Sequence, residues 1–380
     1  MTDRVRVAVA GLGVVAQAVH LPLLARRWDL FEVAAVCDLS PGLRDAVGEQ
    51  YGVRPHARYS DVEEMLAGAD ADATVLLTSG SHGAAALRSL SAGMPVFCEK
   101  PLAYTAAEAD ELAAAESAAD GSALLLAYMK ERDDAVARMA DLLTSVDGIR
   151  AVEVRVLHPS PESQLAFANL RPPAVDVPPQ DLERLMAGDS ALLDAALGAG
   201  TPDWFRRLYA TVVVGSLIHD ISLLRRLVGG LDQVDDVRVW PGQAFPPSVE
   251  VSGSLPGGAR ARLAWHYLED YPAYRETVAV HHSRGSLQVT FGTPYLLNAP
   301  TELEVIEAAA GGEVRSTYRS KGEAFENELV EFHRMVTEGI APLAGIAHGR
   351  ADIISSQRIM ARLADQEGID IGGEAATRGG

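Results

Sequence analysis

Short apolar runs alternate with helix-forming segments through the first 128 residues of the chain. The runs, RVAVAG, FEVAAVCD, ATVLLTS, PVFCE and ALLLAYM, are rich in Val, Leu and Ala. Continuous apolar runs of this length are typical of strands buried on both faces. Strands that alternate with helices form parallel sheets with helices on both sides. We therefore predict a doubly wound α/β domain over residues 1–128.

The pattern changes near residue 146. A longer strand, GIRAVEVRVLH, precedes a polar, Pro-rich stretch at 159–203 and a helix around 204–228. Alternating runs follow, and the turns PGG, SRG and AGG join them in pairs typical of antiparallel hairpins. The sequence therefore predicts an α+β domain over residues 129–370, with a mostly antiparallel sheet. Two closing helices and a disordered tail are expected at roughly 322–338, 348–365 and 371–380.

Composition excludes several classes of protein. Apolar residues make up 48% of the 380 residues and charged residues 22%, as in a soluble globular protein. The formal charge of −19 opposes a nucleic-acid partner, because such binding needs a basic surface. The two cysteines, Cys37 and Cys98, are too few for a disulfide scaffold. No basic-then-apolar leader opens the chain and no run makes a good membrane span, so we expect a cytoplasmic protein without a membrane partner.

No metal site is predicted. His281 and His282 are adjacent, so in a strand they point to opposite faces of the sheet. No cluster of cysteines or acids has the spacing of metal ligands.

The segment VAVAGLGVVAQ carries a G-x-G-x-x-A pattern between the first strand and the first helix. Gly11 permits a tight turn, Gly13 lets a pyrophosphate approach the backbone, and Ala16 lets helix and strand pack closely. Val14 and Val15 complete the loop. Glycine loops also join strands to helices without a ligand, but this position in the chain is the one that dinucleotide binding requires.

Asp38 ends the second strand, about 20 residues after the glycines, where an acid accepts hydrogen bonds from an adenosine ribose. A phosphate on that ribose would meet its negative charge, and no basic residue follows before Arg44. The sequence therefore favours NAD over NADP. The plainer alternative is that Asp38 caps the helix from residue 41, a role that Ser40 could fill equally well.

Polar residues also follow the fourth and fifth strands. Thr78, Ser79 and His82 lie in a loop expected beneath the nicotinamide ribose, although His82 could simply open the next helix. Glu99, Lys100 and Pro101 end the fifth strand, where ligands of doubly wound sheets bind. A lysine there can donate to a substrate hydroxyl and stabilise an alkoxide. The alternative is a solvated Glu–Lys pair at a helix start with Pro at its first position.

A histidine stands on a partly buried helix in the second half. The apolar residues around His219 recur with helical spacing. An imidazole with an unperturbed pKa of about 6.5 can take a proton from a hydroxyl near neutral pH. Taken alone, such a histidine is more often a core residue.

Together, the glycine pattern, Asp38, SGSHGAAALRSLSAGMPVFCEKPLA and SLIHDISLLRRLVG resemble the glucose–fructose oxidoreductase, inositol dehydrogenase and rhizopine catabolism (Gfo/Idh/MocA) family. The resemblance spans nearly the whole chain and is strongest over residues 5–130. It implies a Rossmann domain followed by a large open antiparallel sheet, and oxidation or reduction of one carbinol carbon of a sugar or cyclitol with NAD(P). It also implies that Lys100 and His219 are catalytic, and that a homodimer or homotetramer forms through the open sheet.

One position departs from the family pattern. Members often carry Asp or Asn four residues before the histidine, where this chain has Gly215. Positions four apart share a helix face, so His219 loses a polar partner one turn away and volume opens there. We expect a different substrate or ring orientation, with the proton route resting on Lys100, His219 and Asp220 or on a residue of 159–203.

Four further residues are candidates for substrate contact. Tyr128 and Lys130 follow the sixth strand, where hinge packing is the alternative role. His158 ends the strand expected over the cleft. Trp204 precedes the helix of His219, beside Phe205, and could stack on a sugar, although core packing is the commoner use of either ring.

The sequence as a whole predicts an NAD-dependent oxidoreductase that transfers a hydride between nicotinamide and a ring carbon of a sugar, cyclitol or glycoside. Two alternatives stay open. One is a reductase or dehydrogenase of a non-sugar carbonyl, dihydrodiol or imine. The other is a cofactor-binding regulatory protein without turnover. This alternative stays open because Gly215 replaces the Asp or Asn that family members often carry.

Overall fold

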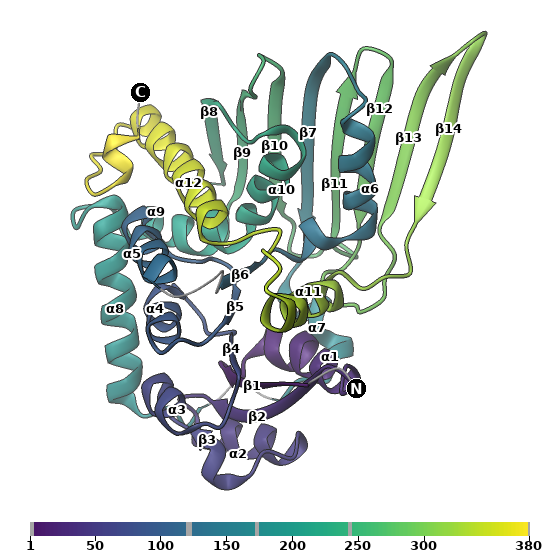
Figure 1. Cartoon of the computed structure of the whole chain (residues 1–380). Coiled ribbons are helices and arrows are strands. Elements are labelled where there is room, and N and C mark those ends of the chain that lie inside the picture. The colour runs from purple at the N-terminus through teal and green to yellow at the C-terminus, as the bar shows by residue number, and fades with distance from the viewer. Residues whose placement is uncertain (1–3, 119–123, 172–174, 242–244, 379–380) are drawn as a thin grey trace. The chain divides into compact units, whose positions relative to one another are not determined.

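The structure is a computed structural model that describes residues 4–118, 124–171, 175–241 and 245–378. The chain forms two compact units, and each is described by itself (Figure 1). The first unit is drawn from Met1–Tyr128, Leu170–Ala199 and Glu328–Ile353. The second is drawn from Met129–Asn169, Gly200–Asn327 and Ile354–Gly380.

A six-stranded parallel sheet with the strand order β3-β2-β1-β4-β5-β6 forms the centre of the first unit. This order reverses between β1 and β4, which is the switch point at which doubly wound sheets bind dinucleotides. The predicted α/β fold of this half is confirmed. The strands are β1 (Val5–Ala10), β2 (Phe31–Cys37), β3 (Arg58–Tyr59), β4 (Ala73–Leu76), β5 (Val96–Glu99) and β6 (Leu124–Ala127).

Helices connect these strands. The strands β4, β5 and β6 are buried at every position, as their continuous apolar runs predict. The connecting elements are a π-helical turn η1 (Ala16–His20), α1 (Leu21–Arg26), α2 (Pro41–Gln50), η2 (Pro55–Ala57), α3 (Val62–Gly68), α4 (Gly83–Ser91) and α5 (Ala106–Ala118).

Residues 170–199 belong to the first unit although they lie far beyond its last strand in the sequence. Most of this segment is one helix, α8 (Pro179–Leu197). The sequence interpretation treated 159–203 as a polar, Pro-rich stretch and did not predict this helix. Its weak apolar pattern explains the omission, because Leu182, Leu185 and Met186 are all exposed.

An eight-stranded sheet forms the second unit, in the order β14-β13-β12-β11-β7-β10-β9-β8. Neighbouring strands are antiparallel except β7 and β10, which are parallel. The mostly antiparallel sheet and its three hairpins are therefore confirmed. The strands are β7 (Ile149–His158), β8 (Gln233–Trp240), β9 (Ser248–Ser254), β10 (Arg260–Tyr267), β11 (Arg275–His282), β12 (Gly285–Phe291), β13 (Glu302–Ala309) and β14 (Gly312–Arg319).

One face of this sheet packs against helices α6 and α10 (Figure 1). Buried Val154, Val278 and Val289 lie in register across three strands, β7, β11 and β12, whereas the residues between them along each strand point to the opposite face. The helical elements are η3 (Met129–Arg132), α6 (Asp134–Leu143), α7 (Pro161–Leu165), η4 (Ala166–Ala168), α9 (Asp203–Arg207), a π-helix η5 (Leu208–Leu217) and α10 (Ile218–Val228). Two long helices that span parts of both units, α11 (Ala324–Glu338) and α12 (Ile346–Glu367), follow the sheet in the chain.

The elements α9, η5 and α10 form one helix, Asp203–Val228. Its length and mean hydropathy of 1.3 would suffice to cross a membrane, but 67% of its most apolar window is buried in the structure. It is a largely buried core helix of the second unit.

The expected tail at 371–380 is described as far as residue 378. It forms a short 3₁₀ turn, η6 (Ala375–Thr377), in which Ala375 is buried. Glu374 accepts a hydrogen bond from Gln357 of α12 at 2.7 Å.

Candidate functional site

The glycine loop of the first unit fits a dinucleotide. Gly11 has φ +89°, and a Cβ there would lie 2.5–2.6 Å from the backbone of Leu77 and Thr78, so only glycine is accommodated. A Cβ on Gly13 would meet nothing within 4 Å, which leaves the backbone open to a pyrophosphate. Ala16 is fully buried, as close packing of helix and strand requires.

Asp38 is fixed beside this loop. Its Oδ2 accepts a hydrogen bond from the backbone N–H of Leu12 at 2.8 Å, and its Oδ1 accepts one from Ser40 N–H at 2.9 Å. Ser40 caps α2, because its hydroxyl accepts from the N–H of Leu43 at 3.0 Å. The alternative that Asp38 is the cap of this helix is therefore wrong.

The corner after β5 explains why a buried strand ends in an acid. Glu99 is 6% exposed, and its Oε1 lies 2.8 Å from His20 Nε2 on the turn that follows the glycine loop. Its Oε2 accepts the backbone N–H of Lys100 at 3.0 Å. Burial opposes ionisation of Glu99, but the hydrogen bond from His20 and charge interactions with His20 and Lys100 outweigh it, so the pKa of Glu99 is lowered. An anionic carboxylate thus fixes the backbone from which Lys100 projects.

The alternative of a fully solvated Glu–Lys pair does not describe this corner. Lys100 is half-buried and its peptide bond to Pro101 is cis. The carbonyl of Pro101 accepts a hydrogen bond from Nδ1 of His82 at 2.7 Å. His82 is buried directly before α4, where it joins the loop after β4 to the turn after β5. Ser79 of that loop is exposed.

His219 lies in the first turn of α10 in the second unit and is half-buried. Its neighbour Asp220 is 1% exposed. Burial and the charge of Glu276 raise the pKa of Asp220 well above its ordinary value, against the opposing charge of Lys130. A neutral carboxyl group therefore follows His219 in the chain.

Glu276 is the centre of this buried cluster. It is fully buried on β11, and its Oε2 is paired with the ammonium of Lys130 and accepts a hydrogen bond from Tyr274 at 2.5 Å. The sequence interpretation missed both Glu276 and Tyr274. A signal was present, because in RETVAV the acid occupies the same alternating phase as the buried Val278 and Val280.

His158 ends β7 beside an aromatic group. Its ring centroid lies 5.1 Å from Trp265 and 5.6 Å from Tyr274. Burial is the main cause that lowers the pKa of His158, so the ring is neutral at pH 7. Trp265 donates from Nε1 to the hydroxyl of Ser216 at 2.9 Å, which links the end of β10 to the π-helix before His219.

The structure brings together some of the predicted residues in each unit. In the first, the glycine loop, Asp38, the loop of Thr78 and the Glu99–Lys100–Pro101 corner follow carboxyl ends of neighbouring strands. Tyr128 is fully buried there. In the second, Lys130 and His158 join the cluster of Asp220, Glu276 and Tyr274. Within the described residues, no group of three or more His, Cys, Asp or Glu side chains is arranged to hold a metal ion.

Trp204 and Gly215 differ from the expected arrangement. Trp204 is 43% exposed and begins the helix that carries His219 fifteen residues later, roughly 20 Å along the helix axis. A small sugar that contacts His219 would not reach it along this helix. A Cβ on Gly215 would lie 3.0 Å from the carbonyl oxygen of Ala210, so the π-helix leaves less room there than the open volume that we expected.

Part of the chain matches the model of a known protein family. Residues 5–125 match the family model described as "Oxidoreductase family, NAD-binding Rossmann fold" (GFO_IDH_MocA). Residues 5–125 are therefore a Gfo/Idh/MocA NAD-binding segment.

A curated relative within this similarity is inositol 2-dehydrogenase/D-chiro-inositol 3-dehydrogenase of Shouchella clausii, 31% identical over 164 residues, which are 43% of this chain and 47% of that protein. The chain spans only 40% to 50% of the length of the curated relatives it matches.

Solved structures share the fold over nearly the whole chain. Aldose–aldose oxidoreductase of Caulobacter crescentus, complexed with glycerol, has a TM-score of 0.69 at 18% identity and covers 98% of this chain and 100% of its own. The WlbA dehydrogenase of Bordetella pertussis, solved with NADH and UDP-GlcNAcA, has a TM-score of 0.67 at 17% identity, with 96% and 98% covered. The fold similarity therefore extends beyond the segment that sequence similarity detects.

Proposed function

We propose that this protein is an NAD-dependent dehydrogenase or reductase that transfers a hydride between nicotinamide and a ring carbinol or carbonyl carbon of a sugar, cyclitol or glycoside. The observation that carries the proposal is the corner after β5. There, the buried Glu99 contacts His20 of η1, the helical turn that follows the glycine loop, and also accepts a hydrogen bond from the backbone of Lys100. Glu99 therefore links the proposed catalytic lysine to the nucleotide-binding loop.

The glycine loop, Asp38 and the loop of Thr78 and Ser79 would hold the dinucleotide, which supplies the hydride-transfer chemistry when bound. Lys100 would donate a hydrogen bond to the substrate oxygen and stabilise its negative charge. His219 would take up or return the hydroxyl proton, as a positioned imidazole does near neutral pH. Burial and the charge of Glu276 raise the pKa of Asp220, so Asp220 would adjoin His219 as a neutral acid.

NAD is the proposed cofactor because Asp38 stands where the adenosine ribose would bind and carries the charge that a ribose phosphate would meet. The relative from Shouchella clausii and the fold relatives support a polyhydroxylated substrate by their names. We propose a cytoplasmic location from the absence of disulfides among the described cysteines, since Cys37 and Cys98 are both buried thiols.

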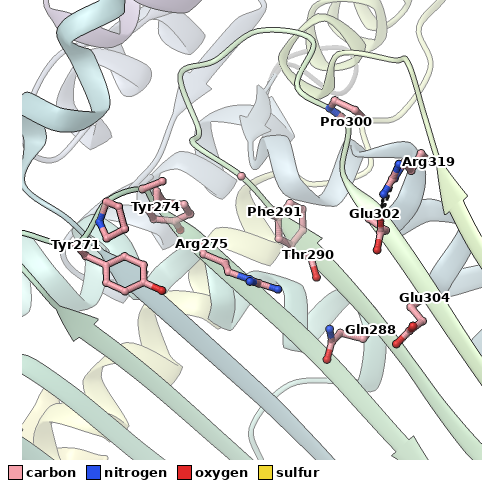
Figure 2. Close-up of a pocket in the computed structure, with 13 residues that line it drawn as sticks. Tyr271, Tyr274, Arg275, Gln288, Thr290, Phe291, Pro300, Glu302, Glu304 and Arg319 are labelled. Carbon is pink, nitrogen blue, oxygen red and sulfur yellow. Dashed lines mark hydrogen bonds and ion pairs between the residues drawn. The ribbon is translucent and has the colours of Figure 1, made fainter.

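We propose that the open face of the second-unit sheet forms a homodimer or homotetramer contact. A hollow of about 780 Å³ lies on it, between Tyr271–Arg275 and strands β12, β13 and β14. Figure 2 shows Arg275 directed toward Gln288 and Thr290, with the ion pair of Glu302 and Arg319 at the other end. These polar side chains can pair with their equivalents across a two-fold axis.

The test is a cofactor-absorbance assay with NAD and NADP against inositols, aldoses, glycosides, dihydrodiols and cyclic imines. The proposal predicts turnover of a cyclitol, sugar or glycoside with NAD. Turnover restricted to a dihydrodiol or imine would replace the substrate class. Tight NAD binding without turnover on any substrate would instead indicate a regulatory protein, so nucleotide binding is measured separately by fluorescence titration.

A further inference from the structure

A carboxylate from the 170–199 segment lies at the start of α2. Asp176 accepts a hydrogen bond from the hydroxyl of Ser40 at 2.5 Å and another from the backbone N–H of Gly42 at 2.7 Å. Ser40 and Gly42 are the cap and the second residue of the helix. The anion therefore occupies the helix N-terminus, where backbone donors and the helix dipole favour negative charge.

The site of Asp176 is shaped for an anion. A Cβ on Gly42 would lie only 2.8 Å from Oδ2 of Asp176, so a larger residue would displace the carboxylate. Ser40 bridges two acids, because its N–H donates to Asp38 while its hydroxyl donates to Asp176. The hydrogen bond from Ser40 is the main cause that lowers the pKa of Asp176, which is therefore ionised at neutral pH.

The 170–199 segment also contacts η1, the helical turn after the glycine loop, and the end of α2. The backbone N–H of Arg171 donates to Gln17 at 3.3 Å, and its guanidinium donates to Gln50 at the end of α2 at 3.0 Å. Residues 171 and 176 thus bind two helices that flank the predicted adenosine site. Arg44 lies nearby, and its Nη1 donates to the carbonyl of Asp38 at 2.5 Å. Its charge also favours the ionised form of Asp176.

NADP differs from NAD by a phosphate on the adenosine ribose, the group that the acid at the position of Asp38 binds. A serine hydroxyl and a helix N-terminal amide are donors that such a phosphate uses. In this chain both donors already bind a carboxylate.

We propose that Asp176 is a cofactor-specificity residue, which excludes the 2′-phosphate of NADP by keeping a carboxylate on the donors that the phosphate would bind. The inference rests on the proposed function, because it concerns the same dinucleotide site. Asp38 and Asp176, which lie 138 positions apart in the sequence, would then both disfavour NADP relative to NAD.

The experiment titrates wild type, Asp176→Ala and Asp176→Asn with NADH and NADPH by nicotinamide fluorescence, and with ADP and 2′-phospho-ADP by calorimetry. Asp176→Ala frees both donors and removes a charge, so the affinity for NADPH relative to NADH should rise about tenfold. Asp176→Asn keeps the volume and an acceptor oxygen, so it should give a smaller rise. Added salt should weaken the discrimination of wild type more than that of either variant.

Asp181→Asn is the matched control, because this acid lies in the same segment but accepts its hydrogen bond from Arg184 within α8. Its NADPH-to-NADH ratio should equal that of wild type. An unchanged ratio in Asp176→Ala, in a protein that binds NADH, would overturn the role of Asp176 alone. Absence of NADH and NADPH binding in wild type would overturn the proposed function instead.

Discussion

Two buried acids adjoin the two proposed catalytic residues, and they differ in charge. Glu99 precedes Lys100 and Asp220 follows His219, with exposures of 6% and 1%. Glu99 meets a histidine and a backbone donor, and its pKa is lowered. Asp220 meets a second acid, and its pKa is raised. Burial opposes ionisation in both cases, so the partner decides whether each acid carries charge.

The difference matches the chemistry proposed for each neighbour. An anion beside Lys100 favours the ammonium form, which can stabilise a negative oxygen. A neutral acid beside His219 places no second negative charge next to the proposed base. The predictions below test this contrast, from the largest effect to the smallest.

The first prediction concerns Lys100 and His219, the two residues proposed to be catalytic. Lys100→Met should lower kcat/KM by about 10²–10³-fold, because one donor to a developing oxyanion is lost. His219→Asn should lower it by about 10²–10⁴-fold and remove the acidic limb of the pH profile. Both variants should bind NADH as wild type does, measured by fluorescence.

The double variant tests whether both residues act on one oxygen. Residues that act as a unit are not additive, so Lys100→Met with His219→Asn should be little worse than the poorer single variant. Losses that multiply would show that the two residues serve separate steps.

The second prediction concerns the buried ion pair of Lys130 and Glu276, whose charges act on the pKa of Asp220 in opposite directions. Lys130→Met leaves Glu276 buried without its cation and should lower the free energy of unfolding by about 3–5 kcal/mol. Lys130→Met with Glu276→Leu removes both charges and should recover most of that loss. Urea denaturation measures both. Equal destabilisation of the single and double variants would contradict a role for the unpaired charge.

The third prediction is that the two acids have opposite pH dependences. A lowered pKa, as in Glu99, adds stability that is present above its unfolded value of about 4.3 and is lost as pH falls through the folded pKa. A raised pKa, as in Asp220, adds stability only below about 3.9, and the protein loses it as pH rises toward the folded value.

Glu99→Gln should therefore be less stable than wild type at pH 7 and approach it in acid. The stability of Asp220→Asn relative to wild type should increase as pH rises from about 4 to 8. Thermal melting of the three proteins from about pH 3 to 8 is the measurement, because the effect of Glu99 is lost only below its unfolded pKa. Curves that shift in the same direction would contradict the contrast.

Sequence reasoning found the residues whose role depends on local order along the chain. The glycine loop, Asp38 and the Glu99–Lys100–Pro101 corner each follow directly from a strand end, so a short stretch identifies them. Strand pairing between β7 and β10 joins residues more than a hundred positions apart, and no turn signal marks it. Asp176 and Glu276 act through partners equally remote, which only the fold supplies.

The smallest predicted effect belongs to Tyr274, the neutral donor in the cluster of Asp220. Tyr274→Phe removes one hydrogen bond to Glu276, which keeps its pairing with Lys130, so the free energy of unfolding should fall by only about 1–2 kcal/mol. The matched change beside Glu99 is His20→Gln, which removes its ionisable partner. If the partners decide whether these acids are charged, His20→Gln should change how the free energy of unfolding depends on pH in the acidic range. Tyr274→Phe should instead lower the free energy of unfolding by the same amount at every pH. Thermal melting from about pH 3 to 8 separates the two results. An equal pH-dependent shift in both variants would show that burial alone governs the charge of these acids.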